Sequence, residues 1–247
     1  MLLDLSTLSR NDGGGDAANI GDASDAATDT SNPSDAFMDV ASKTWIDDFN
    51  RPDSVPIGNG WIMKQPAAFR LVNSRAENRN VNTSYRDNVV YRPATEDVLD
   101  VTVSLEFRVT QPPGYPQVMA RIQQSTVSTP NGLDCYLFFI ANAPNSAMIA
   151  RQRGTAYLTT LATIPLSPPV DTSHDYRLRM TVTGTGSVNI TGEVEVYDTD
   201  KKMWMMIGNQ PITDTSVERI DTAGSVGFST SNGEQLYSYD NFTRTPL

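Results

Sequence analysis

Cysteine and histidine are almost missing from this chain, which has one of each among its 247 residues. A single thiol excludes an intrachain disulfide and a zinc site built from several thiolates, and a single imidazole excludes a metal site with several histidine ligands. Cys135 stands in the apolar stretch DCYLFFI of residues 134–140, a pattern typical of a buried strand. We therefore expect an inert core thiol there rather than a nucleophile.

Basic residues are also in deficit. The chain has 19 Lys and Arg against 29 Asp and Glu, a formal net charge of −10. Residues 1–44 contain eight Asp and two basic residues, so they contribute −6, and residues 45–247 contribute the remaining −4. Because an acidic chain repels phosphate groups, the sequence predicts no nucleic-acid partner and disfavours anionic membrane surfaces.

Long apolar runs are missing as well. No stretch approaches the roughly 20 apolar residues of a membrane-spanning helix. The first residues, MLLDLSTL, lack the basic start and the longer apolar core of a secretory signal peptide. We expect a protein without a membrane span that is made in a cytoplasm without export through a signal peptide.

Residues 9–44 are rich in Gly, Ala, Asp, Ser and Thr, with GGG at residues 13–15. This composition cannot bury enough apolar surface to offset the chain entropy of ordering. One short apolar cluster precedes this segment, at residues 2–8, and another lies near its end, at residues 37–40. A segment of this kind suits docking onto a partner, so we predict that residues 1–44 are an acidic anchoring tail and that the protein is a homo- or hetero-oligomer.

From residue 45 onward the apolar pattern has a period of two. In residues 101–109 (VTVSLEFRV) and 176–182 (YRLRMTV), apolar residues alternate with polar ones, as in half-buried strands. Turn signals such as PPG at 112–114, PNG at 130–132 and SNG at 231–233 separate the strands. No stretch predicts a helix convincingly, so the sequence predicts an all-β sandwich or barrel. Further strands are expected at 69–72, 87–91, 117–124, 134–140, 146–151, 155–163, 188–197, 203–207, 225–229 and 237–243.

The two ends of this region match each other. Residues 45–54 (WIDDFNRPDS) and 57–61 (IGNGW) open it, and residues 224–228 (GSVGF) and 237–242 (YSYDNF) close it. Each end combines an Asp with aromatic residues, and the stretch HDYRLRMTV of residues 174–182 lies between them in the expected order. This combination resembles the concanavalin-like (LamG and laminarinase type) jelly-roll family, whose first and last strands lie side by side. The resemblance covers residues 45–247 and implies one antiparallel two-sheet jelly-roll sandwich.

Domains that open with this motif also resemble those of bacteriophage minor tail proteins and of secreted bacterial carbohydrate-active proteins. The first resemblance implies a structural protein of the virion tail, with other virion subunits as partners through residues 1–44. It further implies a lectin-like sandwich that binds host cell-surface glycan. A fold by itself does not give a function.

The laminarinase branch of the family carries a catalytic strand of the type Glu-x-Asp-x-x-Glu. The nearest match is EVEVYD at residues 193–198, with Glu193, Glu195 and Asp198 in an exchanged order. A retaining glycosidase needs two carboxyl groups about 5–5.5 Å apart. We expect instead a strand with Val194 and Val196 in the core and its acids in water, and hence no catalytic residue.

A Ser-His-Asp triad could use only His174, which has Asp171, Ser173 and Asp175 near it in the sequence. No nucleophile elbow occurs in the chain. We therefore expect His174 at the surface or at the edge of a strand.

If the terminal strands pair, Asp47 or Asp48 comes close to Asp240. Two neighbouring carboxylates repel each other unless a cation or a donor intervenes. Calcium prefers such oxygen ligands, and the family resemblance also implies a calcium site, so Asp48 and Asp240 are the candidate metal ligands. The alternative is that Arg51, Arg244 or backbone N–H groups satisfy these acids.

Aromatic side chains at strand edges or in loops are candidates for stacking against sugar rings. They are Tyr115, Tyr157, Trp204 and Tyr237. For Trp204, inside the run MWMM of residues 203–206, core packing is the favoured alternative.

Three functions remain open from the sequence. The first is a non-enzymatic phage tail component that adheres to host glycan. The second is a bacterial glycoside hydrolase or carbohydrate-binding module with Glu193, Glu195 and Asp198 at its cleft. The third is a capsid decoration protein without a ligand.

Overall fold

The computed structural model describes residues 43–66, 68–79, 86–110, 115–127, 132–141, 144–156, 158–231 and 237–247, with only the backbone for Tyr115 and Ser231. The anchoring tail predicted for residues 1–44 therefore lies almost wholly outside the described residues. Almost all of the regular secondary structure in the described chain lies in two antiparallel β-sheets, which confirms the predicted all-β jelly-roll sandwich.

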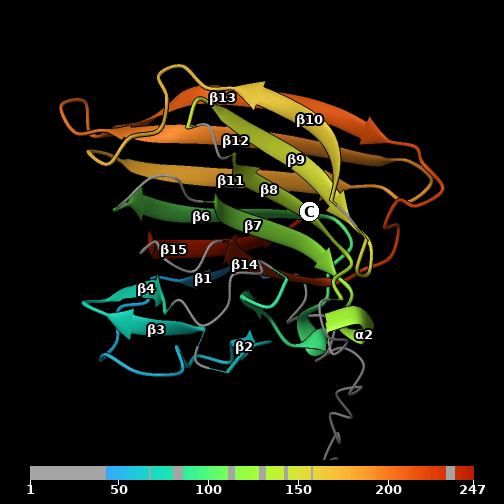
Figure 1. The fold of residues 1–247 in the computed structure, drawn as a ribbon, viewed down its shortest axis with the longest axis horizontal. Helices are drawn as coiled ribbons and strands as arrows, with labels where there is room; N and C mark the ends of the chain where they lie inside the picture. Colours follow the sequence, from blue (N-terminus) through green and yellow to red (C-terminus); the bar gives the residue numbers. More distant parts are fainter. Residues whose placement is uncertain are drawn as a thin grey trace, which may run out of the picture. The chain divides into compact units, whose positions relative to one another are not determined.

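The first sheet has eight strands in the order β13-β12-β11-β6-β15-β4-β3, with β1 paired to β15. It lies behind the second sheet in the view of Figure 1. Its strands are β1 (Trp45–Asp47), β3 (Phe69–Val72), β4 (Arg75–Asn78), β6 (Val101–Val109), β11 (Asp175–Thr183), β12 (Val188–Asp198), β13 (Met203–Asp214) and β15 (Tyr237–Pro246).

The second sheet has seven strands in the order β10-β9-β8-β7-β14-β5-β2. Two short helical segments, η1 (Ala94–Glu96) and α2 (Gln124–Val127), lie between strands. The strands of this sheet are β2 (Ile62–Met63), β5 (Val89–Tyr91), β7 (Tyr115–Ile122), β8 (Cys135–Ile140), β9 (Ser146–Gln152), β10 (Thr159–Pro165) and β14 (Ser225–Ser231).

Alternation along the strands builds the core between the sheets. In β6 and β11 the residues opposite each other are both apolar or both polar, as in the pairs Leu178 with Leu105 and Arg179 with Ser104. The apolar members are fully buried against the inner face of the second sheet, including Phe138 of β8. The polar members line the outer face of the first sheet, so period two in the sequence fixes which side of the sheet is the core.

The second sheet is apolar on both faces. On β8, Tyr136 and Phe138 face the main core, whereas Cys135, Leu137 and Phe139 belong to a second buried cluster. Other members of this cluster are Val89, Met119, Ile122, Val127, Leu133 and Ala150. Antiparallel sheets commonly leave one face in water, whereas this one is covered on both faces over its middle strands and exposed mainly at its edge strand β10. Burial raises the pKa of the Cys135 thiol well above its usual value, which fits the inert core thiol expected from the sequence.

Some elements differ from the sequence expectation. The strands β2 and β4 were not predicted, since each is too short for a period to show. Strand β13 continues to Asp214, well beyond the predicted end at residue 207, through Gly208 and Pro211, which are poor strand formers. Pro211 is tolerated because β13 is the last strand of its sheet.

The first and last strands pair, as the matched ends predict. Trp45 lies opposite Arg244, and Asp47 lies opposite Phe242. Next to this pair, Trp61 makes edge-to-face contacts with Phe228 and Phe242 at centroid distances of 5.1 and 4.9 Å. Aromatic packing thus closes the sandwich where the two ends of the domain meet.

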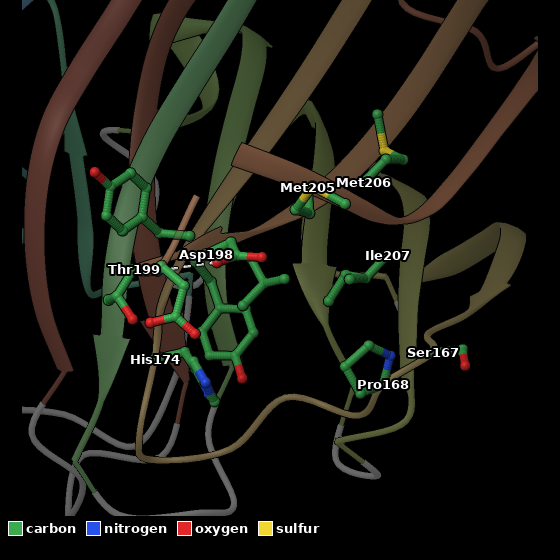
Figure 2. Close-up of a pocket in the computed structure, with 12 residues that line it drawn as sticks. Ser167, Pro168, His174, Asp198, Thr199, Met205, Met206 and Ile207 are labelled. Carbon is green, nitrogen blue, oxygen red and sulfur yellow. Dashed lines mark hydrogen bonds between the residues drawn. The ribbon is translucent and has the colours of Figure 1, made fainter. Parts of the chain in front are cut away.

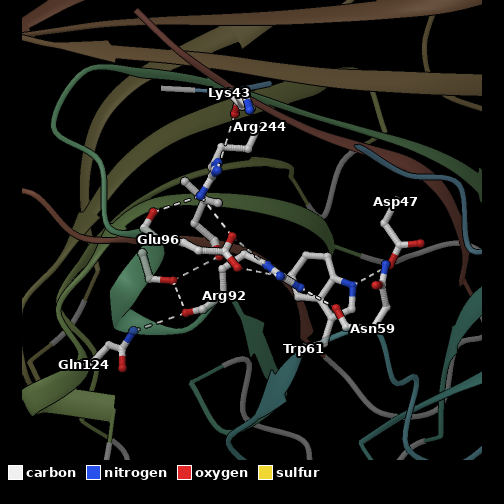
Figure 3. Close-up of polar contacts among 10 residues, drawn as sticks. Lys43, Asp47, Asn59, Trp61, Arg92, Glu96, Gln124 and Arg244 are labelled. Carbon is white, nitrogen blue, oxygen red and sulfur yellow. Dashed lines mark hydrogen bonds and ion pairs between the residues drawn. The ribbon is translucent and has the colours of Figure 1, made fainter. Parts of the chain in front are cut away.

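A buried ionic network reinforces this closure (Figure 3). Glu96 accepts hydrogen bonds from Arg92 at 2.6 Å and from Arg244 at 3.0 Å. The Arg92 guanidinium also stacks over the rings of Trp45 and Trp61, at 4.0 and 5.3 Å from their centroids. The carboxylate of Glu96 in η1 therefore links Arg92, which directly follows β5, to Arg244 in the last strand, β15.

Within the described part of the chain, no helix has the length and apolar character needed to cross a membrane.

Candidate functional site

A pocket of about 480 Å³ opens at one end of the first sheet, between that end and the loop that follows β10 (Figure 2). Three parts of the fold meet there. They are the start of β11, the hairpin that joins β12 to β13, and the β10 loop, which is fixed by a hydrogen bond from the Ser167 amide to the Ile207 carbonyl. The lining residues are Ser167, Pro168, His174, Tyr176, Val196, Tyr197, Asp198, Thr199, Asp200, Met205, Met206 and Ile207.

The floor of the pocket is apolar and continues the main core. Tyr176 and Ile207 belong to the buried core, and Val196 packs against it. Val196 lies opposite Met205 in the β12–β13 pair, so both side chains are on the inner side of the sheet. The floor combines an aromatic ring with aliphatic and thioether groups.

One wall carries a hydrogen-bonded group of three side chains. The carboxylate of Asp171 accepts a bond from the Tyr176 hydroxyl at 3.0 Å and lies 2.9 Å from Nδ1 of His174. Burial raises the pKa of the Asp171 carboxyl, but bonds from His174, the Ser173 amide and Tyr176 outweigh burial and hold this pKa below its usual value. Asp171 therefore stays ionised and orients the imidazole.

A second, neighbouring wall is the β12–β13 hairpin. Asp198 caps the turn by accepting bonds from the amides of Asp200 and Lys201, and its carboxylate also pairs with Lys201 Nζ at 3.0 Å. These bonds with Lys201 keep the pKa of Asp198 below its usual value. Thr199 and Asp200 form the exposed tip of the turn. The turn thus presents a hydroxyl and a carboxylate at the mouth of the pocket.

Next to the pocket, on the outer face of the first sheet, lies an aromatic pair. Tyr197 and Trp204 are cross-strand partners whose rings meet edge to face at 5.3 Å. The Arg177 guanidinium stacks over Trp204 at 4.4 Å. The core packing favoured for Trp204 in the sequence is wrong, since the half-buried ring faces outward. Trp204 is therefore a surface aromatic, although it does not line the pocket.

The acids of the glycosidase-like strand are engaged in ion pairs. Glu195 bonds Arg177 at 2.6 Å, and Glu193 lies 3.3 Å from Arg179. Both pairs lie on the outer face, while Val194 is buried on the inner face. Asp198 sits apart from them in the hairpin turn, so the structure does not gather the three acids at one cleft.

The predicted calcium ligands have hydrogen-bond partners within the chain, since Asp48 accepts a bond from the Asn50 amide at 3.0 Å and Asp240 from the Asn241 amide at 2.9 Å. Burial raises the pKa of Asp240, and the negative charge of Asp48 adds to this shift. The Arg75 guanidinium, 3.8 Å from the Asp240 carboxylate, opposes it. Asp47 is held by Arg51 and by the Trp61 indole at 2.6 and 2.7 Å. Within the described ranges no three His, Cys, Asp or Glu side chains group together to hold a metal ion. The alternative from the sequence, satisfaction by Arg51 and backbone groups, accounts for Asp47.

Of the remaining aromatic candidates, only Tyr237 has a described side chain. Tyr237 is fully buried in the main core, so its predicted role as a stacking surface is wrong; its inward position at the start of β15 follows from the alternation of that strand. Tyr157 lies outside the described residues, and Tyr115 is described only as the first residue of β7.

This pocket could not be predicted from the sequence, because its lining comes from segments that are separate in the chain: the β10 loop, the start of β11 and the two arms of the β12–β13 hairpin. His174 was expected at a strand edge, and it does stand exposed immediately before β11. The turn residues 198–201 (DTDK) are the clearest sequence signal that was overlooked, because Asp followed by polar residues between two strands predicts an Asp-capped hairpin.

Comparisons with known proteins support the fold. No protein-family model and no curated protein sequence match the chain. Among solved structures, a GH43 protein from Bacillus licheniformis superposes with a TM-score of 0.52 at 11% identity over 82% of this chain, which spans only 39% of that protein.

Two further structures match over most of their length. A Bacillus subtilis protein of unknown function with a galectin-like fold gives a TM-score of 0.51 at 14% identity, covering 81% of this chain and 94% of the other. A β-glucanase from Bacillus licheniformis gives 0.50 at 10% identity, covering 83% and 98%. At these identities the likeness establishes a concanavalin-like or galectin-like jelly-roll sandwich, and the resemblance to phage tail proteins stays a prediction.

Proposed function

We propose that this protein is a non-enzymatic carbohydrate-binding component of a virion tail, and that the pocket at the end of its first sheet receives a sugar. The observation that carries the proposal is the combination of an apolar floor with a hydroxyl-rich and carboxylate-rich rim. The pocket's volume of about 480 Å³ lies within the common range for small-ligand sites.

The two parts of the pocket suit the two faces of a sugar. A pyranose ring has an apolar face of C–H groups, which packs against the partly exposed apolar side chains of Val196 and Met205. Its hydroxyl groups need partners that both donate and accept. Ser167, Thr199 and Asp200 supply hydroxyl and carboxylate oxygens from the β10 loop and the β12–β13 hairpin.

Two observations support binding without catalysis. Glu193 and Glu195 are occupied by arginines rather than facing each other across a cleft. On the outer face of β8, the side chains are Cys135, Leu137 and Phe139, which offer no acid or base. Glycoside hydrolysis needs a pair of positioned carboxyl groups.

The setting on a virion tail rests on the resemblance of residues 45–61 to phage minor tail proteins, and the strand registers are compatible with it. Tyr176, at the pocket, pairs with Phe107 near the end of β6, whereas Arg244, opposite Trp45, pairs with Val103 near its start. The chain thus enters the sandwich at the end of the first sheet that is opposite the pocket. An attachment through residues 1–44 would leave the pocket accessible.

Glycan-array binding of the full chain, with and without calcium, tests the binding function. We expect specific binding that chelation of calcium does not abolish. The substitution Thr199→Trp places a large ring at the mouth of the pocket and should weaken binding at least about tenfold, since it excludes the ligand sterically. The matched variant Thr215→Trp, at the other end of β13 and also exposed, should bind like the unmodified protein.

Binding that survives Thr199→Trp would place the site elsewhere, and a flat array would remove the carbohydrate function. The virion setting has a separate test, which is mass spectrometry and immunogold labelling of purified particles whose genome encodes the chain. Its absence from those particles would leave a bacterial carbohydrate-binding module as the better assignment.

A further inference from the structure

We infer that the pocket discriminates by charge, accepting uncharged or amine-bearing sugars and rejecting sugars that carry a carboxylate, sulfate or phosphate group. The inference rests on the proposed function, because it names the class of sugar that this same pocket takes.

The charges around the pocket are of one sign. Asp198 and Asp200 line the hairpin wall, and Asp171 is bonded to His174, which lines the pocket beside that wall. No lysine or arginine side chain is part of the described lining. The nearest cation in the hairpin, Lys201, is already paired with Asp198 at 3.0 Å. An anionic ligand would therefore meet carboxylates without a cation to compensate them.

The hydrogen-bonding polarity points the same way. An ionised carboxylate can only accept, so the contact of 2.9 Å between Asp171 and Nδ1 of His174 places the ring proton on Nδ1. In neutral His174 the other nitrogen, Nε2, is then an acceptor. Nε2 of His174 and the Asp200 carboxylate therefore favour a ligand that donates hydrogen bonds, such as a sugar hydroxyl or an ammonium group.

An acidic substituent on a sugar carries only hydrogen-bond acceptors. At this rim it would face the Asp200 carboxylate and Nε2 of His174, which are acceptors as well. Like charges brought together in an interface without a counter-ion weaken binding. In a water-exposed site, one unit charge about 4 Å away changes the dissociation constant by about fivefold to tenfold. With Asp200 exposed at the mouth, we expect at least about fivefold discrimination between a neutral sugar and its acidic counterpart.

The test uses the full chain and matched probes at one ionic strength. Each neutral oligosaccharide on the array is paired with its C6-oxidised uronate form, and N-acetylglucosamine oligomers are paired with their de-acetylated, amine-bearing forms. Neutral and amine-bearing probes should bind at least about fivefold more tightly than the acidic ones. Asp200→Lys should improve binding of the uronate probes relative to the neutral ones by more than this factor, since it changes the charge at the mouth by two units.

Asp221→Lys is the control, because Asp221 is exposed and lies outside the pocket lining. It should leave the neutral-to-acidic ratio unchanged. Acidic probes that bind the unmodified protein as tightly as neutral ones would overturn this inference while leaving carbohydrate binding intact. An unchanged ratio in Asp200→Lys would also overturn it, whereas failure of every probe to bind would remove the proposed function itself.

Discussion

Asp97 is a carboxylate that the fold stabilises poorly. It follows η1, and its Oδ1 atom is buried without a hydrogen-bond partner. Burial raises the pKa of Asp97 to about 6. The ordinary pKa of Asp in an unfolded chain is about 3.9. Between about pH 3.9 and pH 6, the Asp97 carboxyl is therefore mostly protonated in the folded protein and mostly ionised in the unfolded chain.

The sign of the effect follows from this linkage. Above pH 6 the buried charge lowers the stability of the fold, and this loss disappears as the pH falls toward 4. Asp97→Asn should therefore raise the free energy of unfolding by about 1 kcal/mol at pH 7.5, a shift of about 2–4 °C in the melting temperature. At pH 4 it should have little effect. Thermal unfolding at both pH values checks this, and an equal gain at both would point to better amide packing instead.

Single residues also mark the limit of prediction from sequence. Composition and the pattern of residues 134–140 were enough to place Cys135 in a buried strand. For Tyr237 and Trp204, the local pattern did not determine which face of the sheet the aromatic ring would occupy. Tyr237 turned inward and Trp204 outward, because the register of β15 and β13 decides the side and is set by their partner strands.

At the scale of elements, the sandwich depends on close approach between its two sheets. Gly192 of β12 faces Phe138 of β8, and a Cβ atom at this position would lie 2.7 Å from the ring. Phe138 is fully buried and cannot yield easily. Gly192→Ala should therefore destabilise the protein by about 1–3 kcal/mol through overpacking.

Chemical denaturation checks this expectation, with Gly186→Ala as the control because a Cβ there meets nothing within 4 Å. The double variant Gly192→Ala with Phe138→Leu should be more stable than the sum of the two single changes implies, since the smaller side chain makes room. Additive losses would show that the contact does not limit the packing of the sheets.

Strand prediction succeeded where alternation extends over many residues. Strands β6 and β11 match the expected ranges closely because each has one buried and one polar face. It failed for β2 and β4, which are held in their sheets by neighbouring strands rather than by their own patterns. The full length of β13 was hidden by Gly208 and Pro211, whose low strand propensity is overridden by pairing with β12.

At the scale of the whole molecule, the ends of the domain are joined through Glu96. Its carboxylate is shared by Arg92 and Arg244, and both guanidinium groups are almost fully buried. Glu96→Gln removes the carboxylate that two buried guanidinium groups share and should lower the free energy of unfolding by about 3 kcal/mol or more.

A surface pair gives the comparison. Glu77→Gln, which breaks the partly exposed pair with Arg70 at 3.1 Å, should change stability by less than about 1 kcal/mol. Urea denaturation of both variants checks the difference. A loss of similar size in the two would mean that desolvation cancels the attraction within the Glu96 network.

The pocket belongs to this scale, which explains why its residues could not be grouped from the sequence. The pairing of the first and last strands could be expected from the family resemblance, and the hairpin turn from its local composition. The approach of the β10 loop to β13 could not, since it depends on how the edges of two different sheets meet.

The pairing of β1 with β15 has a consequence for assembly. Because the chain enters the sandwich at the end of the first sheet remote from the pocket, copies tethered in parallel through their entry strands would all present their pockets in the same direction. Several weakly binding pockets could then engage one surface at the same time. Such tethering can raise the overall affinity by a factor of about 10²–10⁴ without any new contact. Adhesion would be set by the spacing of copies as much as by the chemistry of one pocket.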